Sequence, residues 1–158
     1  MKNLLLLIAA SLVLTTSACK KESTAQVTLS NSWTLGTTSH TTAFTSRINV
    51  NSMFAITAMD GVPQGSNPTV NTCIVYFAAA PTASGTYRVV SYPSALTSMQ
   101  VGVVAGGSTG TYTSTGTGAV DVKVTVTNGK IQAVIPELTV KKINATEELK
   151  LSGSISEL

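Results

Sequence analysis

The residues able to do acid–base or metal chemistry are few and widely spaced. The chain has one histidine, His40, and seven carboxylates. No histidines, cysteines or acids stand at the spacing of a zinc, calcium or metalloprotease motif, so we expect no metal site and no cofactor. We expect His40 to be a strand residue near a sheet edge. The main acidic candidates are Asp60, Asp121, Glu137, Glu147 and Glu148.

Glycoside hydrolysis by these acids would need two carboxylates facing each other across a cleft. We expect Asp60 to lie in a turn and Asp121 to face solvent from a strand. Residues 147–148 are expected to form a polar turn before the last strand. No G-x-S-x-G nucleophile motif and no phosphate loop is present. The sequence therefore predicts a protein that is not an enzyme. The alternative is a small enzyme whose site is built from Asp60, His40 or the late glutamates.

Aromatic side chains are the remaining candidates for ligand contact, since a flat ring can stack on a sugar. Tyr92 precedes Pro93, and Tyr112 lies in the Gly/Thr-rich stretch 106–118, so both are expected in loops. Trp33 alternates with polar neighbours and is expected to pack in the core, with ligand contact as the alternative. The candidate ligand-binding residues are therefore Tyr92, Tyr112 and Trp33.

The first 19 residues have the layout of a secretory signal peptide: Lys2, an apolar run at 4–14, small residues at 15–18, then Cys19. The apolar run is too short for a bilayer-spanning helix. A cysteine after such a run resembles the lipobox of bacterial lipoproteins, which implies that Cys19 becomes the lipid-bearing first residue. Thr16 stands where that family prefers leucine. An ordinary signal peptide, cut at the same bond, remains the alternative.

The tether after Cys19 begins Lys20-Lys21-Glu22. This run resembles the charged segment of surface-exported lipoproteins of Bacteroidota, which usually carry more acids. The resemblance implies an outer-membrane protein that is exposed at the cell surface, with a periplasm-facing anchor as the alternative. If Cys19 is lipidated, Cys73 has no disulfide partner. Its apolar setting at 72–77 predicts a buried, unreactive thiol.

The elements that must position these residues are strands. The clearest signal is the alternation of valines at 120–126, the turn Asn128-Gly129, and the return at 131–135, which predicts an antiparallel hairpin. Pro136-Glu137 shifts the apolar parity, which indicates a bulge or an edge position. Residues 38–50 and 53–59 are expected to be strands, the latter apolar on both faces. Residues 71–78 are expected to form a central strand, and 106–118 a loop or weak edge strand.

Together these signals predict an all-β fold, an antiparallel β-sandwich of about eight to ten strands, with a closed lipocalin-like β-barrel as the alternative. The expected organisation is a signal peptide at 1–18, a lipidated N-terminus and flexible tether at 19–30, and a single β domain at 31–158. The segments 77–90 and 151–155 resemble small β-domain lipoproteins of unknown function from Bacteroidota.

Charged residues make up only 11% of the chain, and its basic residues form no more than doublets, which argues against nucleic-acid binding. We therefore expect a non-catalytic module that is held at the membrane through Cys19. Its expected partner is a glycan, a peptide or another envelope protein. The alternatives are an accessory subunit of an outer-membrane complex and a carrier of an apolar ligand.

Overall fold

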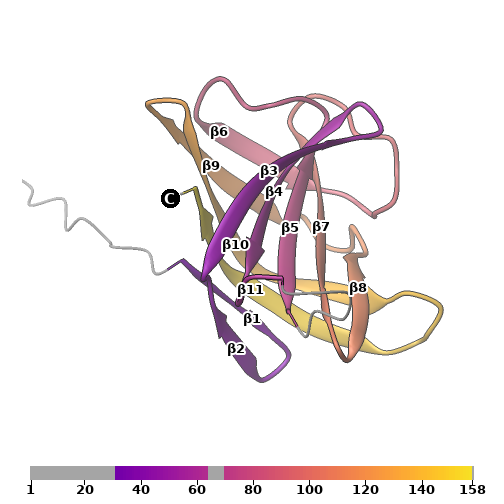
Figure 1. The fold of residues 1–158 in the computed structure, drawn as a ribbon. Helices are drawn as coiled ribbons and strands as arrows, with labels where there is room; N and C mark the ends of the chain where they lie inside the picture. The colour runs from indigo at the N-terminus through magenta and orange to yellow at the C-terminus, as the bar shows by residue number, and fades with distance from the viewer. Residues whose placement is uncertain (1–30, 64–69, 158) are drawn as a thin grey trace, which may run out of the picture.

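The computed structural model describes residues 31–63 and 70–157, which form an all-β structure without a helix (Figure 1). This confirms the predicted fold class. The predicted signal peptide, the lipid-bearing Cys19 and the tether lie outside the described residues. The strands are β1 (Ser32–Leu35), β2 (Thr38–Thr41), β3 (Phe44–Val50), β4 (Met53–Met59), β5 (Thr72–Phe77), β6 (Gly85–Val89), β7 (Gln100–Gly107), β8 (Gly110–Ser114), β9 (Asp121–Thr127), β10 (Lys130–Lys142) and β11 (Glu148–Ser156).

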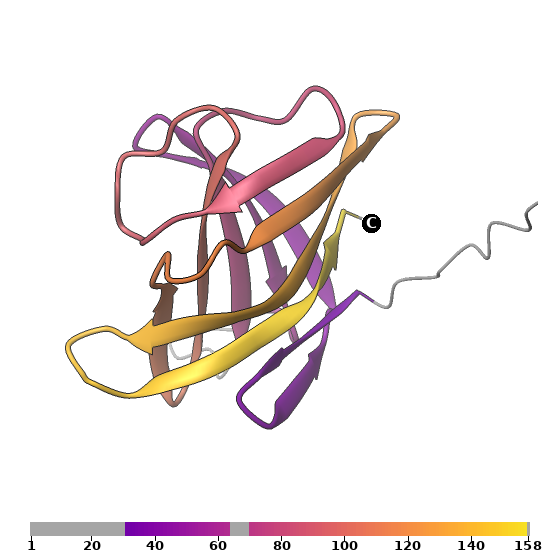
Figure 2. The same cartoon turned by 180° about the vertical axis from the view of Figure 1, so that it is seen from behind.

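All eleven strands belong to one hydrogen-bonded sheet, in which ten follow the order β2-β1-β11-β10-β9-β6-β7-β5-β4-β3 and β8 lies off this path, paired with β10 and β7. The sheet folds over, so that the layer of β3, β4, β5 and β7 faces the layer of β9, β10 and β11 (Figures 1 and 2). This two-layer arrangement agrees with the expected sandwich. The strand pairs are antiparallel except β6 and β7, which run parallel. No ladder among the described residues joins β2 to β3, which are the free edges of the sheet, so its strands do not form one closed lipocalin-like ring, although β8 pairs with both β7 and β10 and so links the two layers.

The hairpin predicted around Asn128-Gly129 is present. β9 and β10 pair antiparallel, and Val126 lies opposite Ile131. Both turn residues have positive φ angles, 52° and 74°, as a two-residue hairpin turn requires. The register of β10 against β11 shifts after Ile135, which confirms the bulge predicted at 136–137.

The expectation of a loop or weak edge strand at 106–118 is wrong. β7 extends to Gly107, and β8 then runs between β7 and β10, with which it forms ladders on either side. Tyr112 on β8 is therefore buried, with 2% of its surface exposed. Its burial depends on β10, whose partner residues lie about thirty positions further along the chain, and no local pattern could indicate that pairing.

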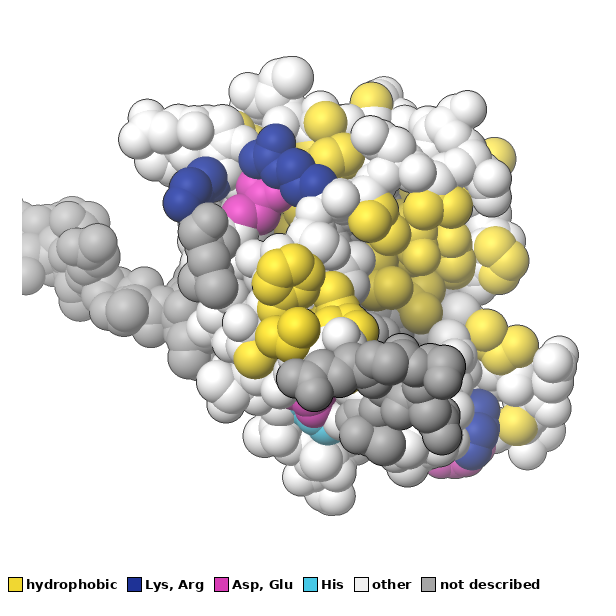
Figure 3. Space-filling model, in the orientation of Figure 1, with side chains coloured by type: hydrophobic (Ala, Val, Ile, Leu, Met, Phe, Trp, Pro, Cys, Tyr) yellow, Lys and Arg dark blue, Asp and Glu magenta, His cyan; other side chains and the backbone are white. Residues whose placement is uncertain are grey.

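The core lies between the two layers and contains Trp33, Val75, Phe77, Ile135 and Leu151, each at most 2% exposed. Cys73 is fully buried, as predicted. The outer surface of the β3–β4–β5–β7 layer also carries hydrophobic side chains (Figure 3). None of the described segments contains a helix with the length and apolar character needed to span a bilayer.

The segment predicted as one strand at 38–50 is divided into β2 and β3, which occupy opposite ends of the ladder order. The chain turns between them at Thr42 and Ala43. The Thr42 amide donates to the Asn31 carbonyl (2.8 Å), and the Ala43 amide donates to the Met59 carbonyl (2.7 Å). The two open edges of the sheet therefore meet at this corner, and side chains rather than a backbone ladder join them.

Candidate functional site

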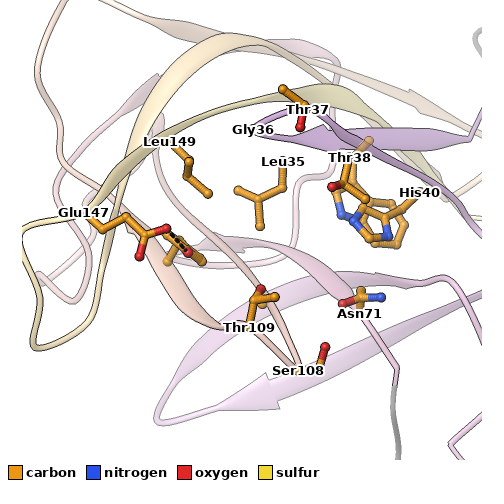
Figure 4. A pocket seen from close by; sticks show the side chains of 13 residues that line it. Leu35, Gly36, Thr37, Thr38, His40, Asn71, Ser108, Thr109, Glu147 and Leu149 are labelled. Atoms are coloured by element: carbon orange, nitrogen blue, oxygen red, sulfur yellow. Dashed lines mark hydrogen bonds between the residues drawn. The ribbon is translucent and has the colours of Figure 1, made fainter.

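A pocket of about 370 Å³ lies at the end of the sheet near the β1–β2 turn (Figure 4). This volume falls within the range of about 300–1,000 Å³ that is typical of ligand pockets. The rest of its lining comes from β1, β2, the residue before β5, the β7–β8 hairpin, and β11 with the loop before it. Its lining consists of Trp33, Leu35, Gly36, Thr37, Thr38, His40, Asn71, Gly106, Ser108, Thr109, Tyr112, Glu147 and Leu149.

His40 is held at one wall of the pocket by Asp60. Its Nδ1 lies 2.9 Å from Asp60 Oδ2, and 11% of the His40 side chain is exposed. Asp60 also accepts hydrogen bonds from the Asn71 amide (2.8 Å) and from Asn71 Nδ2 (2.7 Å). This cluster links β2, the end of β4 and the start of β5. The pairing makes Nδ1 the protonated nitrogen of the neutral ring and leaves Nε2 as a hydrogen-bond acceptor.

The Asp60 carboxyl is ionised at neutral pH. Burial raises its pKa, but the hydrogen bonds from the Asn71 side chain and amide, together with the hydrogen bond and charge of His40, outweigh burial. The net pKa of Asp60 therefore lies below its ordinary value of 3.8. An ionised Asp60 fixes both the tautomer and the orientation of the imidazole.

Trp33 supports the same ring from behind. The indole and the imidazole are stacked, with their centroids 5.1 Å apart and their planes 18° apart. Trp33 is only 2% exposed, because β1 lies between β2 and β11 and turns this side chain into the core. A buried indole offers no free face to a sugar. The expectation of core packing for Trp33 is confirmed, and its contribution to the pocket is to hold His40.

Glu147 carries negative charge at the opposite wall of the pocket. Its Oε1 accepts a hydrogen bond from the Tyr112 hydroxyl (2.7 Å), and its Oε2 lies 3.1 Å from Lys142 Nζ. The hydrogen bonds from Tyr112 and Lys142 lower the pKa of Glu147, and the same carboxylate raises the pKa of Tyr112. The lysine also lies over the tyrosine ring, 5.7 Å from its centroid. These contacts fix the carboxylate at the rim of the pocket.

The pocket offers mainly acceptors and hydroxyls. Its strongest polar groups are the Glu147 carboxylate and the His40 Nε2, both acceptors in the neutral-ring form. Hydroxyl groups surround them, and the side chains of Leu35 and Leu149 form an apolar wall (Figure 4). The hydroxyls belong to Thr37, Thr38, Ser108 and Thr109. Such a lining is complementary to a neutral ligand that is rich in hydroxyl donors.

The sequence-based candidates are only partly brought together. Trp33 and Tyr112 both line the pocket, but each is 2% exposed. Tyr92 lies elsewhere and stacks on Tyr76, with ring centroids 4.6 Å apart. His40 is on the edge strand β2, as expected, and Asp60 is beside it. Cys19 lies outside the described residues.

Two pocket residues were missed as ligand candidates. Asn71 belongs to no sequence motif, and the sequence around Glu147 is that of a polar turn. Within residues 31–63 and 70–157, no group of three or more His, Cys, Asp or Glu side chains is placed to hold a metal ion. Comparisons of the chain with protein-family models, with curated proteins and with solved structures give no significant match.

Proposed function

We propose that the protein is a lipid-anchored component of the bacterial outer membrane, that its β domain is a non-catalytic binding module, and that the pocket binds the end of a neutral glycan. The observation that carries the ligand class is the chemistry of the lining. A fixed carboxylate and an imidazole acceptor stand on opposite walls among hydroxyl side chains. Sugar hydroxyls can donate to both acceptors, and the apolar wall suits the carbon face of a pyranose.

The other candidate roles have less support. The interior between the layers is filled by side chains that are almost fully buried, which argues against a carrier that would enclose an apolar ligand there. A peptide amine could pair with Glu147, yet Lys142 already neutralises part of that charge. An accessory subunit of a membrane complex would not need a pocket with two fixed acceptors.

A glycan array, followed by calorimetry on the best hit, tests the proposal. Glu147→Gln keeps the shape and the acceptor for Tyr112 but removes the charge, so affinity should fall about tenfold or more, since hydrogen bonds to charged groups contribute about 1.5–3 kcal/mol. Glu148→Gln is the matched control, because this exposed neighbour lies outside the pocket lining. Absence of neutral-glycan binding, or equal losses in both variants, would contradict the assignment.

The proposed anchor is tested separately. The mass of the mature N-terminus should correspond to Cys19 bearing acyl chains, several of which together anchor a protein durably. Protease treatment of intact cells distinguishes a surface-exposed domain, which is cleaved, from one that faces the periplasm and is protected. An unmodified Cys19 in cells with a functional lipoprotein pathway would refute the anchor.

A second candidate function, hydrolysis, is favoured by one observation: the His40–Asp60 pair has the orientation of a general base and its supporting acid. We rank it second because no hydroxyl or thiol in the described part of the chain is hydrogen-bonded to His40 as a nucleophile would be. Hydrolysis of chromogenic esters or glycosides that is lost in His40→Asn but retained in Glu148→Gln would promote it to first place.

A further inference from the structure

In the layer of β3, β4, β5 and β7, the strands β4 and β5 are apolar on both of their faces. On β4, Ile56 points into the core, while Met59 belongs to the outer face. On β5, Val75 is fully buried in the core, while Ile74 and Tyr76 alternate onto the outer face. An antiparallel sheet that faces water normally carries polar side chains on its outer side, and strands that are apolar on both faces are normally covered on both. The outer face of this layer therefore has the composition of a contact surface.

The described residues cover this face only in part. Tyr92 stacks on Tyr76 and packs over Gly102, so the side nearest β7 is covered. At the β3 side, Phe44 is 43% exposed and lies opposite Met59. In Figure 3 hydrophobic side chains gather over this face, and the charged side chains lie toward its margins. We call the set Phe44, Ile48, Met59 and Ile74 the outer patch.

The point where the chain enters the domain indicates what covers the outer patch. The Asn31 carbonyl accepts the Thr42 amide (2.8 Å), so the entry point lies beside the corner that leads into β3 and Phe44. Twelve residues, 19–30, connect Cys19 to this point. A chain of that length spans at most about 40 Å. A lipid on Cys19 would thus hold Phe44 within reach of the bilayer surface.

We propose that the outer patch docks on the bilayer that holds the protein's own anchor. This inference rests on the proposed lipid anchor. A short tether gives the patch an effective concentration in the millimolar range at the membrane, so a patch of weak intrinsic affinity is engaged for much of the time. Docking places the β3–β4–β5–β7 layer against the headgroups and turns the β9–β10–β11 layer toward the solution.

The test uses the lipidated full-length protein in phosphatidylcholine vesicles that contain lipids brominated near the headgroup. Tryptophan is introduced at the patch as Phe44→Trp or Ile48→Trp, and on exposed β6 as Thr86→Trp. Trp33 is buried in all three proteins and contributes the same background. Urea midpoints within the wild-type range establish that each variant is folded. Ile48→Trp serves as an independent reporter if Phe44→Trp is destabilised.

Docking predicts that bromine quenching at the patch positions exceeds quenching at Thr86→Trp by at least about twofold. Equal quenching at both positions in an anchored protein overturns the inference and leaves the proposed function intact. Shielding of Phe44→Trp from aqueous iodide without bromine quenching, together with cross-linked dimers, would assign the patch to a second copy and also overturn it. If the purified full-length protein carries no lipid and does not associate with vesicles, both the proposed anchor and this inference are refuted.

Discussion

Replacing Asp60 by alanine removes the acceptor of three hydrogen bonds at the corner where the two sheet edges meet. The donors are the Asn71 amide, the Asn71 side chain and His40 Nδ1, at 2.7–2.9 Å. Each hydrogen bond to a charged group can contribute about 1.5–3 kcal/mol. The Asp60 side chain is 22% exposed, so water weakens these contacts. We take about 1 kcal/mol for each bond, which predicts a loss of about 3 kcal/mol in the free energy of unfolding.

The loss should be visible in both thermal and urea denaturation. For a domain of this size, 1 kcal/mol corresponds to about 3–5 °C, so the midpoint should fall by roughly 10–15 °C at neutral pH. The effect should depend on pH. Because the folded-state pKa of Asp60 lies below 3.8, the unfolded chain binds the proton more readily, and acid favours unfolding. The stabilisation that ionised Asp60 contributes is complete above its pKa in the unfolded chain, and it is lost as the pH falls through its pKa in the folded protein.

The difference in free energy of unfolding between wild type and Asp60→Ala should therefore become smaller as the pH falls from about 5 to about 2. Glu137→Ala is the matched control, since this carboxylate is 68% exposed and lies 3.6 Å from Lys150 Nζ. Its loss should stay below about 1 kcal/mol, as is usual for exposed ion pairs. The reasoning would be refuted if the difference in free energy of unfolding between wild type and Asp60→Ala did not change with pH, or if it were no larger than that for Glu137→Ala.

Three further changes have defined outcomes. Gly153→Ala should cost about 3 kcal/mol or prevent folding, because the new Cβ would lie 2.6 Å from Trp33 Cα at a φ of +156°; the urea midpoint measures this. Cys73 should react with a thiol reagent only in denaturant, since burial raises its pKa to about 12; mass spectrometry of labelled protein gives the answer. Arg47→Ala should lower the free energy of unfolding by about 0.5–1 kcal/mol, because it removes the ion pair with Glu157. The loss should be smaller in high salt, and denaturation at two salt concentrations measures it.

The parts of the fold that the sequence predicts are those determined by neighbouring residues. The hairpin at Asn128-Gly129 follows from alternating valines and a turn that tolerates positive φ, and both are local. The bulge after Ile135 follows from a change in parity within one strand. β8 was missed because this Gly/Thr-rich segment is held between β7, which directly precedes it, and β10, which is distant in the sequence. Its buried residues, Tyr112 and Ser114, are determined by this tertiary pairing rather than by a strand pattern of their own.

The candidate site was predictable only as separate residues. Trp33 and Tyr112 were singled out as aromatics, and His40 and Asp60 as titratable groups, but no spacing indicated that they would meet. His40 lies on β2, whereas Asp60 follows β4, beside β3 at the opposite end of the ladder order. Their contact exists because the sheet folds until its two edges meet. A periodicity argument describes one strand at a time and contains no information about that closure.

The same incomplete closure accounts for the position of the pocket. A backbone ladder between two edges brings strands to about 4.8 Å and leaves no room between them. Here β2 is only four residues long and pairs with β1, so the edges are joined by side chains instead: His40 to Asp60 beside the pocket, and Arg47 to Glu157 farther along β3. Side-chain closure leaves a gap lined by polar groups at the β1–β2 end, which is where His40, Asn71 and the β7–β8 turn surround the pocket. The hydrogen bond between His40 and Asp60 therefore both joins the sheet edges and fixes one of the two acceptors to which we assign ligand binding, which makes Asp60 a determinant of both stability and affinity.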